Sequence, residues 1–294
     1  MKLVDGVMTL HQSDISQYMK CPEQFRLANG ISPNATWNPP DGGRVESDAA
    51  TVGTVLHGVI EQDLIYPFDT LEKANSFGRQ YLGSLITGYV EDGVEYRTES
   101  FGADPQVALR ELGWLIESWY KSAERTYWLE RDPKTFLIES FFDVPFVKRP
   151  GREICEVRLA GTPDLVDLQE NRVVDWKSAS RPYQRWEYQR WGIQPTAYTF
   201  AAADQGLIEP NGDGLYKFDY RIFIKGKKLE TQGITVLRGP GQWGWLTQVV
   251  NNIADLAESD ATVWPLRDDG WWCGPRWCPI WTTCKGMFVD EEWT

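Results

Sequence analysis

The stretch of sequence that decides the fold is GTPDLVDLQENRVVDWKS, residues 161–178. Two short apolar runs flank the polar segment 169–172, a pattern that predicts two strands joined by a turn. Because successive side chains of a strand alternate between its faces, Asp175 and Lys177 are expected to point to the same side. Asp164, on the partner strand, can face them. Two carboxylates and an ammonium on one hairpin suit a hard cation and metal-assisted hydrolysis of a phosphodiester.

The composition is that of an ordinary globular protein. The chain has 294 residues, of which 42% are hydrophobic and 24% charged, enough for one large domain or two small ones. No apolar run is long enough to span a membrane, and the N-terminal residues lack the apolar core of a signal peptide. We therefore expect a cytoplasmic protein.

The net charge of −12 argues against a protein coated in positive charge for non-specific binding of nucleic acid. A nucleic-acid enzyme stays open, because bound divalent cations offset acidic sites and a local basic groove can suffice. The basic side chains after the hairpin either form such a groove or are solvated surface charges: Arg181, Arg185, Arg190, Lys225, Lys227 and Lys228.

The rest of the chain alternates helical and extended patterns. Helices are predicted at about 11–28 with an interruption at Pro22, and at about 50–64, 70–90, 105–130, 183–203 and 241–258. Strands are predicted near 136–147, 153–168 and 172–178, with one or two more around 216–237. Residues 31–50 are rich in Pro, Gly and Asn and indicate a loop. The order predicts an α/β fold with a mixed sheet and a large helical N-terminal part.

Three other places can complete a site around the hairpin. His57 and Glu61 are four residues apart and share a helix face, where His57 is either a Mn²⁺ ligand or a hydrogen-bonded core histidine. Gln194 and Tyr198 lie one helical turn apart, where they can contact a phosphate or orient the lysine, or act only as cap and core residues. Glu139, in a predicted strand, is either a neighbour of the metal or a solvent-facing residue, and we favour the solvent-facing position.

The hairpin supports a specific mechanism. Asp164 and Asp175 would hold one or two Mg²⁺ or Mn²⁺ ions, with the backbone carbonyl of Trp176 as a further oxygen ligand. The metal lowers the pKa of a bound water, and Lys177 would position that water and stabilise the charge that develops on phosphorus. The alternative is a surface turn with scattered charges.

The cysteines form a second pattern. Three of the five, Cys273, Cys278 and Cys284, lie close together near the C-terminus, and Cys21 precedes a proline near the other end. An intracellular chain seldom uses disulfides, so this set indicates a metal site, either a [4Fe–4S] cluster or Zn²⁺, unless the thiols are unliganded. Cys155 alternates within a strand pattern and is expected to be a buried small hydrophobe.

Taken in order, these motifs resemble the RecB-type branch of the PD-(D/E)XK nuclease superfamily. The resemblance is strongest to iron–sulfur members such as the AddB nuclease domain, CRISPR-associated exonucleases and phage-encoded relatives. It covers nearly the whole chain, because the ordered motifs match Cys21-Pro-x-x-Phe25, Gly53-x-x-x-His57-x-x-x-Glu61, Gly161-x-x-Asp164, Asp175-x-Lys177 and Gln194-x-x-x-Tyr198.

The resemblance implies a restriction-endonuclease-like fold, with a central mixed sheet flanked by helices, a helical N-terminal part and a cysteine-rich C-terminal tail. It implies a single nuclease domain over residues 1–294, with a catalytic core at about 50–240 and a tail at 264–294 tied to the Cys21 helix. It assigns His57, Asp164 and Asp175 as metal ligands and Lys177 as the catalytic lysine. Gln194 and Tyr198 become active-site motif residues.

The resemblance also assigns Cys21, Cys273, Cys278 and Cys284 to an iron–sulfur cluster. One departure concerns the C-terminal trio, which in the family is commonly Cys-x-x-Cys-x5-Cys. Here Cys278 and Cys284 keep the second interval, but the first cysteine is Cys273, and Pro275 stands at the expected position.

Two functions are compatible with these motifs. The first is a Mg²⁺- or Mn²⁺-dependent deoxyribonuclease, an exonuclease that acts on DNA ends or single strands in recombination, replication or repair. The second is a non-cleaving scaffold with a nuclease-like fold, stapled by an Fe–S or Zn site, that binds DNA or a protein partner. The sequence contains no GxxxxGK[ST] motif, which argues against an ATPase.

Overall fold

The chain forms two compact units, and each is described separately. The computed structural model describes residues 1–31, 48–86, 89–91, 94–96, 105–186, 189, 192–267, 270, 272–274, 278 and 280–284. The terminal unit contains Met1–Pro39, Phe141–Gly161 and Pro240–Thr294. The central unit contains Pro40–Ser140 and Thr162–Gly239. The chain therefore passes between the two units more than once.

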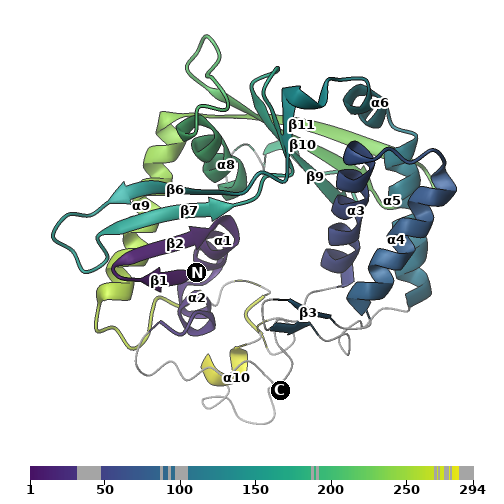
Figure 1. The fold of residues 1–294 in the computed structure, drawn as a ribbon. Helices are drawn as coiled ribbons and strands as arrows, with labels where there is room; N and C mark the ends of the chain where they lie inside the picture. Colours follow the sequence, from purple (N-terminus) through teal and green to yellow (C-terminus); the bar gives the residue numbers. More distant parts are fainter. Residues whose placement is uncertain are drawn as a thin grey trace. The chain divides into compact units, whose positions relative to one another are not determined.

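The terminal unit is built on a four-stranded sheet with the order β1-β2-β7-β6 (Figure 1). These strands are Lys2–Val4, Val7–His11, Glu156–Gly161 and Phe142–Lys148, respectively. β1 and β2 form a hairpin around Asp5-Gly6, both of which have positive φ, as expected for an Asp-Gly turn. The sequence interpretation missed this hairpin, although Met8 and Leu10 alternate as buried residues along β2.

Helices cover the terminal sheet. α1 (Gln12–Lys20) and α2 (Pro22–Ala28) replace the single helix predicted at about 11–28, because Pro22 begins the second helix, as predicted. α9 (Pro240–Glu258) packs on β6 and β7, and a short helix, α10, spans Trp281–Cys284.

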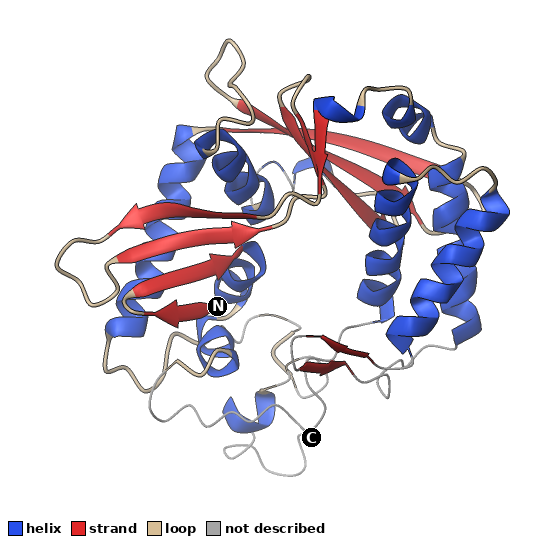
Figure 2. Cartoon of the chain, viewed as in Figure 1, coloured by secondary structure: helices blue, strands red, loops and turns tan. Residues whose placement is uncertain are grey.

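The central unit contains a five-stranded mixed sheet with the order β11-β10-β9-β8-β5 (Figure 2). The strands are Glu230–Arg238, Tyr216–Ile224, Arg172–Ala179, Leu165–Asp167 and Phe136–Ile138. β9 and β10 are parallel and the other pairs antiparallel. The helices are α3 (Asp48–Ile65), α4 (Leu71–Ile86), α5 (Pro105–Tyr120), α6 (Ala123–Leu129) and α8 (Ile193–Asp204). A short 3-10 helix, Pro133–Thr135, precedes β5, and a small hairpin joins β3 (Tyr89–Glu91) and β4 (Val94–Tyr96).

Helices lie on both faces of the central sheet. Trp176 of β9 packs edge-on against Trp119 of α5, with ring centroids 6.0 Å apart. Its neighbour Asp175 hydrogen-bonds to Gln194 of α8. Because adjacent side chains of a strand point to opposite faces, α5 and α8 cover opposite faces of the sheet. α3, α4 and α5 pack side by side on the Trp176 face and enclose the apolar core of the unit (Figure 1).

The predicted mixed α/β fold is confirmed, with its strands divided differently. The strand predicted at 136–147 is two strands, because Glu139 ends β5 with φ of 47° and β6 begins at Phe142 in the other sheet. The strand predicted at 153–168 is likewise interrupted, since Thr162-Pro163 separates β7 from β8. The helix predicted at 70–90 ends at Ile86.

Several predicted segments fall partly outside the described residues. These are the 31–50 loop, the first half of the helix predicted at 183–203, Arg190, and much of the 264–294 tail. None of the helices in the described part of the chain is long and apolar enough to cross a membrane.

Candidate active site

The site lies where β8 leaves β9. β9 pairs with β10 along its whole length, but it pairs with β8 only from Arg172 to Val174. Among the described strands, the second half of β9, which carries Asp175 and Lys177, therefore has no partner on the β8 side. Leu165 of β8 is opposite Val174, so Asp164, which precedes the strand, lies at the opening of this notch in the sheet.

Asp164 connects the hairpin to α3. One carboxylate oxygen, Oδ2, accepts a hydrogen bond of 2.6 Å from the backbone N–H of Trp176. The other, Oδ1, lies 3.1 Å from Nδ1 of His57. Burial opposes ionisation of Asp164, but His57 and Lys177 outweigh it and hold its pKa below the ordinary value. The same contact with Asp164 raises the pKa of His57 against the effect of burial.

Asp175 and Lys177 form an ion pair on the other side of the notch. Asp175 is 1% exposed, and its Oδ2 lies 2.6 Å from Nζ of Lys177. Its Oδ1 accepts a hydrogen bond of 2.6 Å from Nε2 of Gln194. Burial, reinforced by the nearby Asp164, raises the pKa of Asp175 to about 6. Burial opposes the charge on Lys177, but the two aspartates outweigh it and raise the pKa of the ammonium above its usual value.

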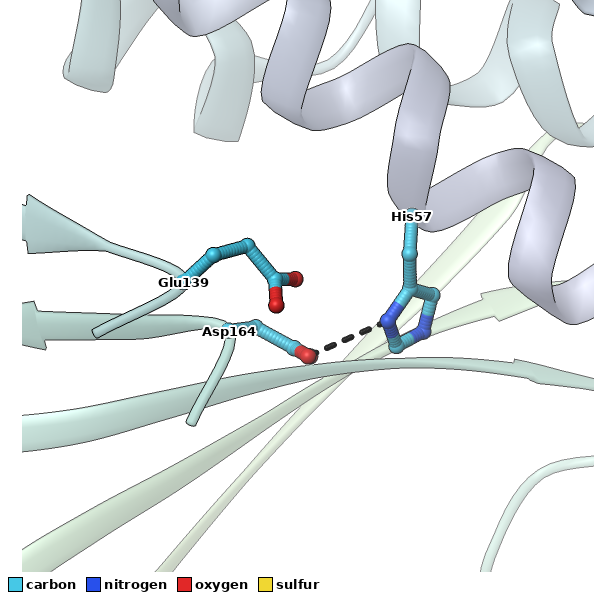
Figure 3. Close-up of side chains that lie close together, drawn as sticks. All are labelled: His57, Glu139 and Asp164. Atoms are coloured by element: carbon cyan, nitrogen blue, oxygen red, sulfur yellow. Dashed lines mark hydrogen bonds and ion pairs between the residues drawn. The ribbon is translucent and has the colours of Figure 1, made fainter. Parts of the chain in front are cut away.

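Glu139 brings a third carboxylate to the site. Its backbone N–H donates to the carbonyl oxygen of Asp164, 3.1 Å away, which anchors the residue beside the notch. In Figure 3 its side chain points toward Asp164 and His57, and one ligand atom from each of these three residues lies within 4.8 Å of the others. Burial, together with Asp164 and Glu61, raises the pKa of Glu139 to about 7.

Gln194 and Tyr198 approach from α8, one helical turn apart. Gln194 contacts Asp175 directly, whereas Tyr198 is buried beside it. Burial and the charge of Asp175 raise the pKa of Tyr198 to about 12, so its hydroxyl is neutral at physiological pH. The helix thus brings an amide and a phenol to the carboxylates, the arrangement expected from their four-residue spacing.

The donors at this site fit a divalent cation. Carboxylate oxygens and an imidazole are ligands that Mn²⁺ accepts, and oxygens are those that Mg²⁺ prefers. Oδ2 of Asp175 is buried and makes no hydrogen bond within the described structure, despite its nearby ammonium. A buried carboxylate oxygen without a hydrogen bond has capacity left for a cation.

Comparisons with known proteins give the family. The family model described as the PD-(D/E)XK nuclease superfamily matches residues 9–285. The chain belongs to this superfamily. No curated protein matches the chain by sequence.

One solved structure shares the fold of this chain. A candidate exonuclease from Eubacterium rectale is 12% identical, with a TM-score of 0.52, and the match covers 92% of this chain and 91% of that one. The structure of SSO0001 is also 12% identical, covering 90% of this chain and 97% of that one, but its TM-score of 0.33 supports no argument. At these identities the likeness concerns the fold alone.

In this member of the PD-(D/E)XK nuclease superfamily, the structure places side by side six residues singled out by the sequence: His57, Asp164, Asp175, Lys177, Gln194 and Tyr198. It also corrects the prediction for Glu139, because this residue faces the carboxylates rather than solvent. Glu139 directly follows the short apolar strand β5, and its backbone has the left-handed conformation, which changes the direction of the chain there. That conformation is uncommon for a non-glycine residue and is not visible in a hydrophobicity pattern.

All five cysteines belong to the terminal unit, whereas the carboxylates, His57 and Lys177 belong to the central unit. Cys21 caps α2 and Cys284 ends α10, and both are half-buried, as are Cys273 and Cys278. In the part of the chain that is described, no three of these sulfurs approach within 4.8 Å of one another. The expectation for Cys155 is wrong: this residue is exposed, because β7 begins after it and Ile154 takes the buried position.

The candidate basic residues divide into two groups. Lys225 forms an ion pair with Glu111 at 3.0 Å, and Lys228 lies 4.0 Å from Glu230. Arg181 and Arg185 are exposed beyond the end of β9. Lys225 is thus a largely buried partner of Glu111, Lys228 is an exposed charge beside Glu230, and the arginines lie in the segment that connects β9 to α8.

Proposed function

We propose that this protein is a Mg²⁺- or Mn²⁺-dependent deoxyribonuclease that hydrolyses DNA from its ends. The observation that carries the proposal is the notch itself, where Asp164, Asp175 and Lys177 meet His57 and Glu139. This is more negative charge than the neighbouring cations balance, on a scaffold of the nuclease superfamily. Because the chain belongs to a superfamily of nucleases, we take DNA as the substrate.

We assign the metal to Asp164, Asp175, Glu139 and His57, with the carbonyl of Trp176 as a further oxygen ligand. When bound, the metal would supply a water of lowered pKa and polarise the scissile phosphate. The protein orients Asp164 before any metal binds, because the N–H of Trp176 and the side chain of His57 hold its two carboxylate oxygens. Held carboxylates lose little freedom when they bind a cation, which favours a fixed geometry.

Lys177 is proposed to hold the attacking water and to stabilise the charge that develops on the phosphoryl oxygens. Its side chain is 27% exposed, and its ammonium is paired with Asp175 at 2.6 Å. Its raised pKa keeps it protonated at physiological pH, which suits an electrostatic role rather than that of a general base. Gln194 orients Asp175, and Tyr198 offers a hydroxyl that does not ionise.

Exonuclease action is the finer part of the proposal. It is supported by the ordered motifs that resemble RecB-type exonucleases and by the name of the Eubacterium rectale structure. Work on DNA ends or single strands would place the enzyme in recombination, replication or repair.

A nuclease assay tests both parts. Linear and covalently closed DNA, each single- and double-stranded, are incubated with Mn²⁺ and the wild type, Asp175→Asn or Lys177→Met. We expect the wild type to degrade linear DNA, to leave closed circles intact, and to need both residues. Cleavage of closed circles would overturn the exonuclease assignment but not the nuclease. A wild type that cuts none of the four substrates would favour a DNA-binding scaffold.

We also propose that Cys21, Cys273, Cys278 and Cys284 bind a [4Fe–4S] cluster, with Zn²⁺ as the other candidate. The four thiols lie in one unit, and burial together with the neighbouring Cys273 and Cys21 raises the pKa of Cys278. Partly desolvated thiols suit a thiolate-bound metal. Protein purified without oxygen should contain iron and acid-labile sulfide, and Cys278→Ser should lose both. Stoichiometric zinc in a colourless protein would exclude the Fe–S cluster.

A further inference from the structure

A second pocket of the central unit lies at β11, the edge strand of the sheet. Its volume is about 330 Å³, and its lining is basic and polar: Arg185, Gln189, Thr235, Leu237 and Arg238. No acidic residue is among the described residues that line it. In a chain with a net charge of −12, two arginines in one small pocket indicate an anionic ligand.

Arg238 is a built part of this pocket rather than a surface side chain. The residue is only 2% exposed, and its guanidinium is fixed by donating from Nε to Oγ1 of Thr196 and from Nη1 to the carbonyl of Leu237. Burial lowers the pKa of Arg238, so its positive charge lies in a largely desolvated place.

The N-terminus of α8 adds positive electrostatic potential beside Arg238. Gly192 is the N-cap of this helix and makes no side-chain cap hydrogen bond. Nη2 of Arg238 lies 3.1 Å from the position that a Cβ would occupy at Gly192, so the guanidinium packs against the helix start. Two positive features, a helix N-terminus and a buried guanidinium, are in contact there, and together they favour a negative group beside them.

Arg185 completes the pocket from the segment that enters α8. Tyr183, two residues earlier, is held to the sheet by reciprocal hydrogen bonds with Gln232, of 2.8 Å to its N–H and 3.0 Å to its carbonyl. This clamp fixes the chain just before Arg185, whose side chain is exposed. The pocket thus combines one rigid, buried arginine with one that solvent can reach.

The pocket and the catalytic notch share α8. Gln194 contacts Asp175, and Thr196, two residues further on, accepts from Arg238. Residues two apart lie on nearly opposite sides of a helix, so the first turn of α8 separates the two places by about the 10 Å width of a helix. A DNA strand that passes the start of this helix spans such a distance with one or two nucleotides.

We propose that the Arg185–Arg238 pocket binds a non-scissile backbone phosphate of the DNA strand whose scissile phosphate lies at the notch. This inference rests on the proposed function and extends it to a longer footprint on the substrate. A guanidinium fork matches a phosphate in geometry and charge. The pocket contributes affinity without sequence preference, because it contacts the backbone only.

The test uses Arg185→Ala, which removes an exposed side chain, with Arg185→Lys and the exposed Arg79→Ala of α4 as controls. Binding of a fluorescent single-stranded oligonucleotide is measured in EDTA over a range of salt concentrations. We expect Arg185→Ala to weaken binding about tenfold and to reduce the salt slope by about 0.7, as for one lost phosphate contact. Arg185→Lys should keep most of the slope, and Arg79→Ala should match the wild type.

A kinetic arm locates the contact on the substrate. Thymidine 5′-phosphate p-nitrophenyl ester carries one phosphodiester, which reaches the notch alone. Arg185→Ala should leave its turnover unchanged while it raises KM for an oligonucleotide with kcat retained. An equal loss on both substrates would overturn the proposal, since it would place Arg185 at the reacting phosphate or in the fold.

The remaining outcomes separate this inference from the proposed function. If the wild type cuts DNA and Arg185→Ala binds DNA as the wild type does, the pocket proposal fails and the nuclease stands. If the wild type cuts nothing but Arg185→Ala still weakens binding, the pocket stands without the nuclease. If inorganic phosphate raises the Tm of the wild type but not of Arg185→Ala while both bind DNA equally, the ligand is a free anion, and the assignment to DNA is overturned.

Discussion

Buried carboxylates at the two ends of the β8–β9 hairpin differ in their partners and in their pKa values. At the turn end, Asp167 accepts from Arg131 at 2.8 Å, from Arg172 at 3.0 Å and from the N–H of Glu170 at 3.0 Å. Arg172 also donates to Asp219 on β10 at 2.7 Å. At the notch end, three carboxylates share one histidine and one lysine, and the pKa values of Asp175 and Glu139 are raised.

The difference separates a structural charge cluster from a reactive one. Rigid guanidinium forks satisfy several lone pairs at once, so the turn end needs nothing further. At the notch end, burial outweighs the neighbouring cations for Asp175 and Glu139, so these two carboxylates bind protons more tightly than usual. Within a few residues of one hairpin, the protein therefore builds a closed site and an open one.

The sharpest test of this contrast exchanges one aspartate for asparagine at each end. Asp164→Asn should lower nuclease activity by at least about 100-fold, because it removes a charge that the metal and substrate need. Asp167→Asn should act mainly on stability: it removes the carboxylate shared by Arg131 and Arg172 and costs about 3 kcal/mol, while the folded fraction stays active. Activity assays paired with urea unfolding measure both. If Asp167→Asn proved the more damaging to activity, the contrast between the ends would be wrong.

The effect of pH on stability should distinguish the notch next. The pKa of Asp175 is raised to about 6 from an ordinary value of 3.8, so the folded state binds this proton more tightly than the unfolded state. Its stabilising contribution is complete below about pH 4 and is lost as the pH rises through 6. Without metal, the wild type should lose roughly 2 kcal/mol relative to Asp175→Asn between these limits, as measured by urea unfolding at each pH.

Addition of Mn²⁺ is the control for that experiment. The ion binds the deprotonated carboxylate, so it should restore the stability of the wild type above pH 6 and have little effect on Asp175→Asn. An equal stabilisation of both proteins by Mn²⁺ would place the ion elsewhere.

A smaller effect is expected at Glu139, the carboxylate that the sequence interpretation assigned to solvent. Glu139→Gln keeps the shape and removes the charge, and we expect Mn²⁺ affinity to fall by about tenfold, as calorimetry can measure. The exposed Glu130, outside the notch, provides the matched Glu→Gln control. A Glu139→Gln protein with wild-type affinity would reduce the metal site to His57 and the two aspartates.

The smallest effect should come from Gln194. Gln194→Leu removes the hydrogen bond to Oδ1 of Asp175, and we expect kcat to fall by about fivefold with the fold intact, corresponding to about 1 kcal/mol for one neutral donor. Steady-state kinetics measure it. A loss as large as that of Asp175→Asn would make Gln194 a catalytic group in its own right.

Much of this molecule could be predicted from its sequence. The hairpin was visible because two apolar runs flank a polar turn, and the spacing Asp-x-Lys fixes a shared face in any strand. His57 with Glu61, and Gln194 with Tyr198, follow from helical spacing in the same way. These are local rules, and the fold preserves them.

The features that could not be predicted from the sequence depend on backbone conformation and on contacts between residues far apart in the chain. The turn of the chain at Glu139 and the break at Thr162-Pro163 divide two predicted strands between two sheets, which hydrophobic periodicity cannot distinguish from continuous strands. The pairing of Asp167 with Arg131 joins residues far apart in sequence and leaves no local pattern. The contact of Arg238 with Thr196 likewise joins residues far apart in sequence.

Glu139 has a consequence for anyone who tries to make this protein more heat-resistant. Its left-handed backbone, with φ of 47°, costs a non-glycine residue on the order of 1 kcal/mol, and glycine would relieve that cost. A screen for thermostability would therefore favour glycine at this position, and the same change would delete a carboxylate from the notch. At this one residue, a substitution that raises thermal stability is expected to lower the catalytic rate.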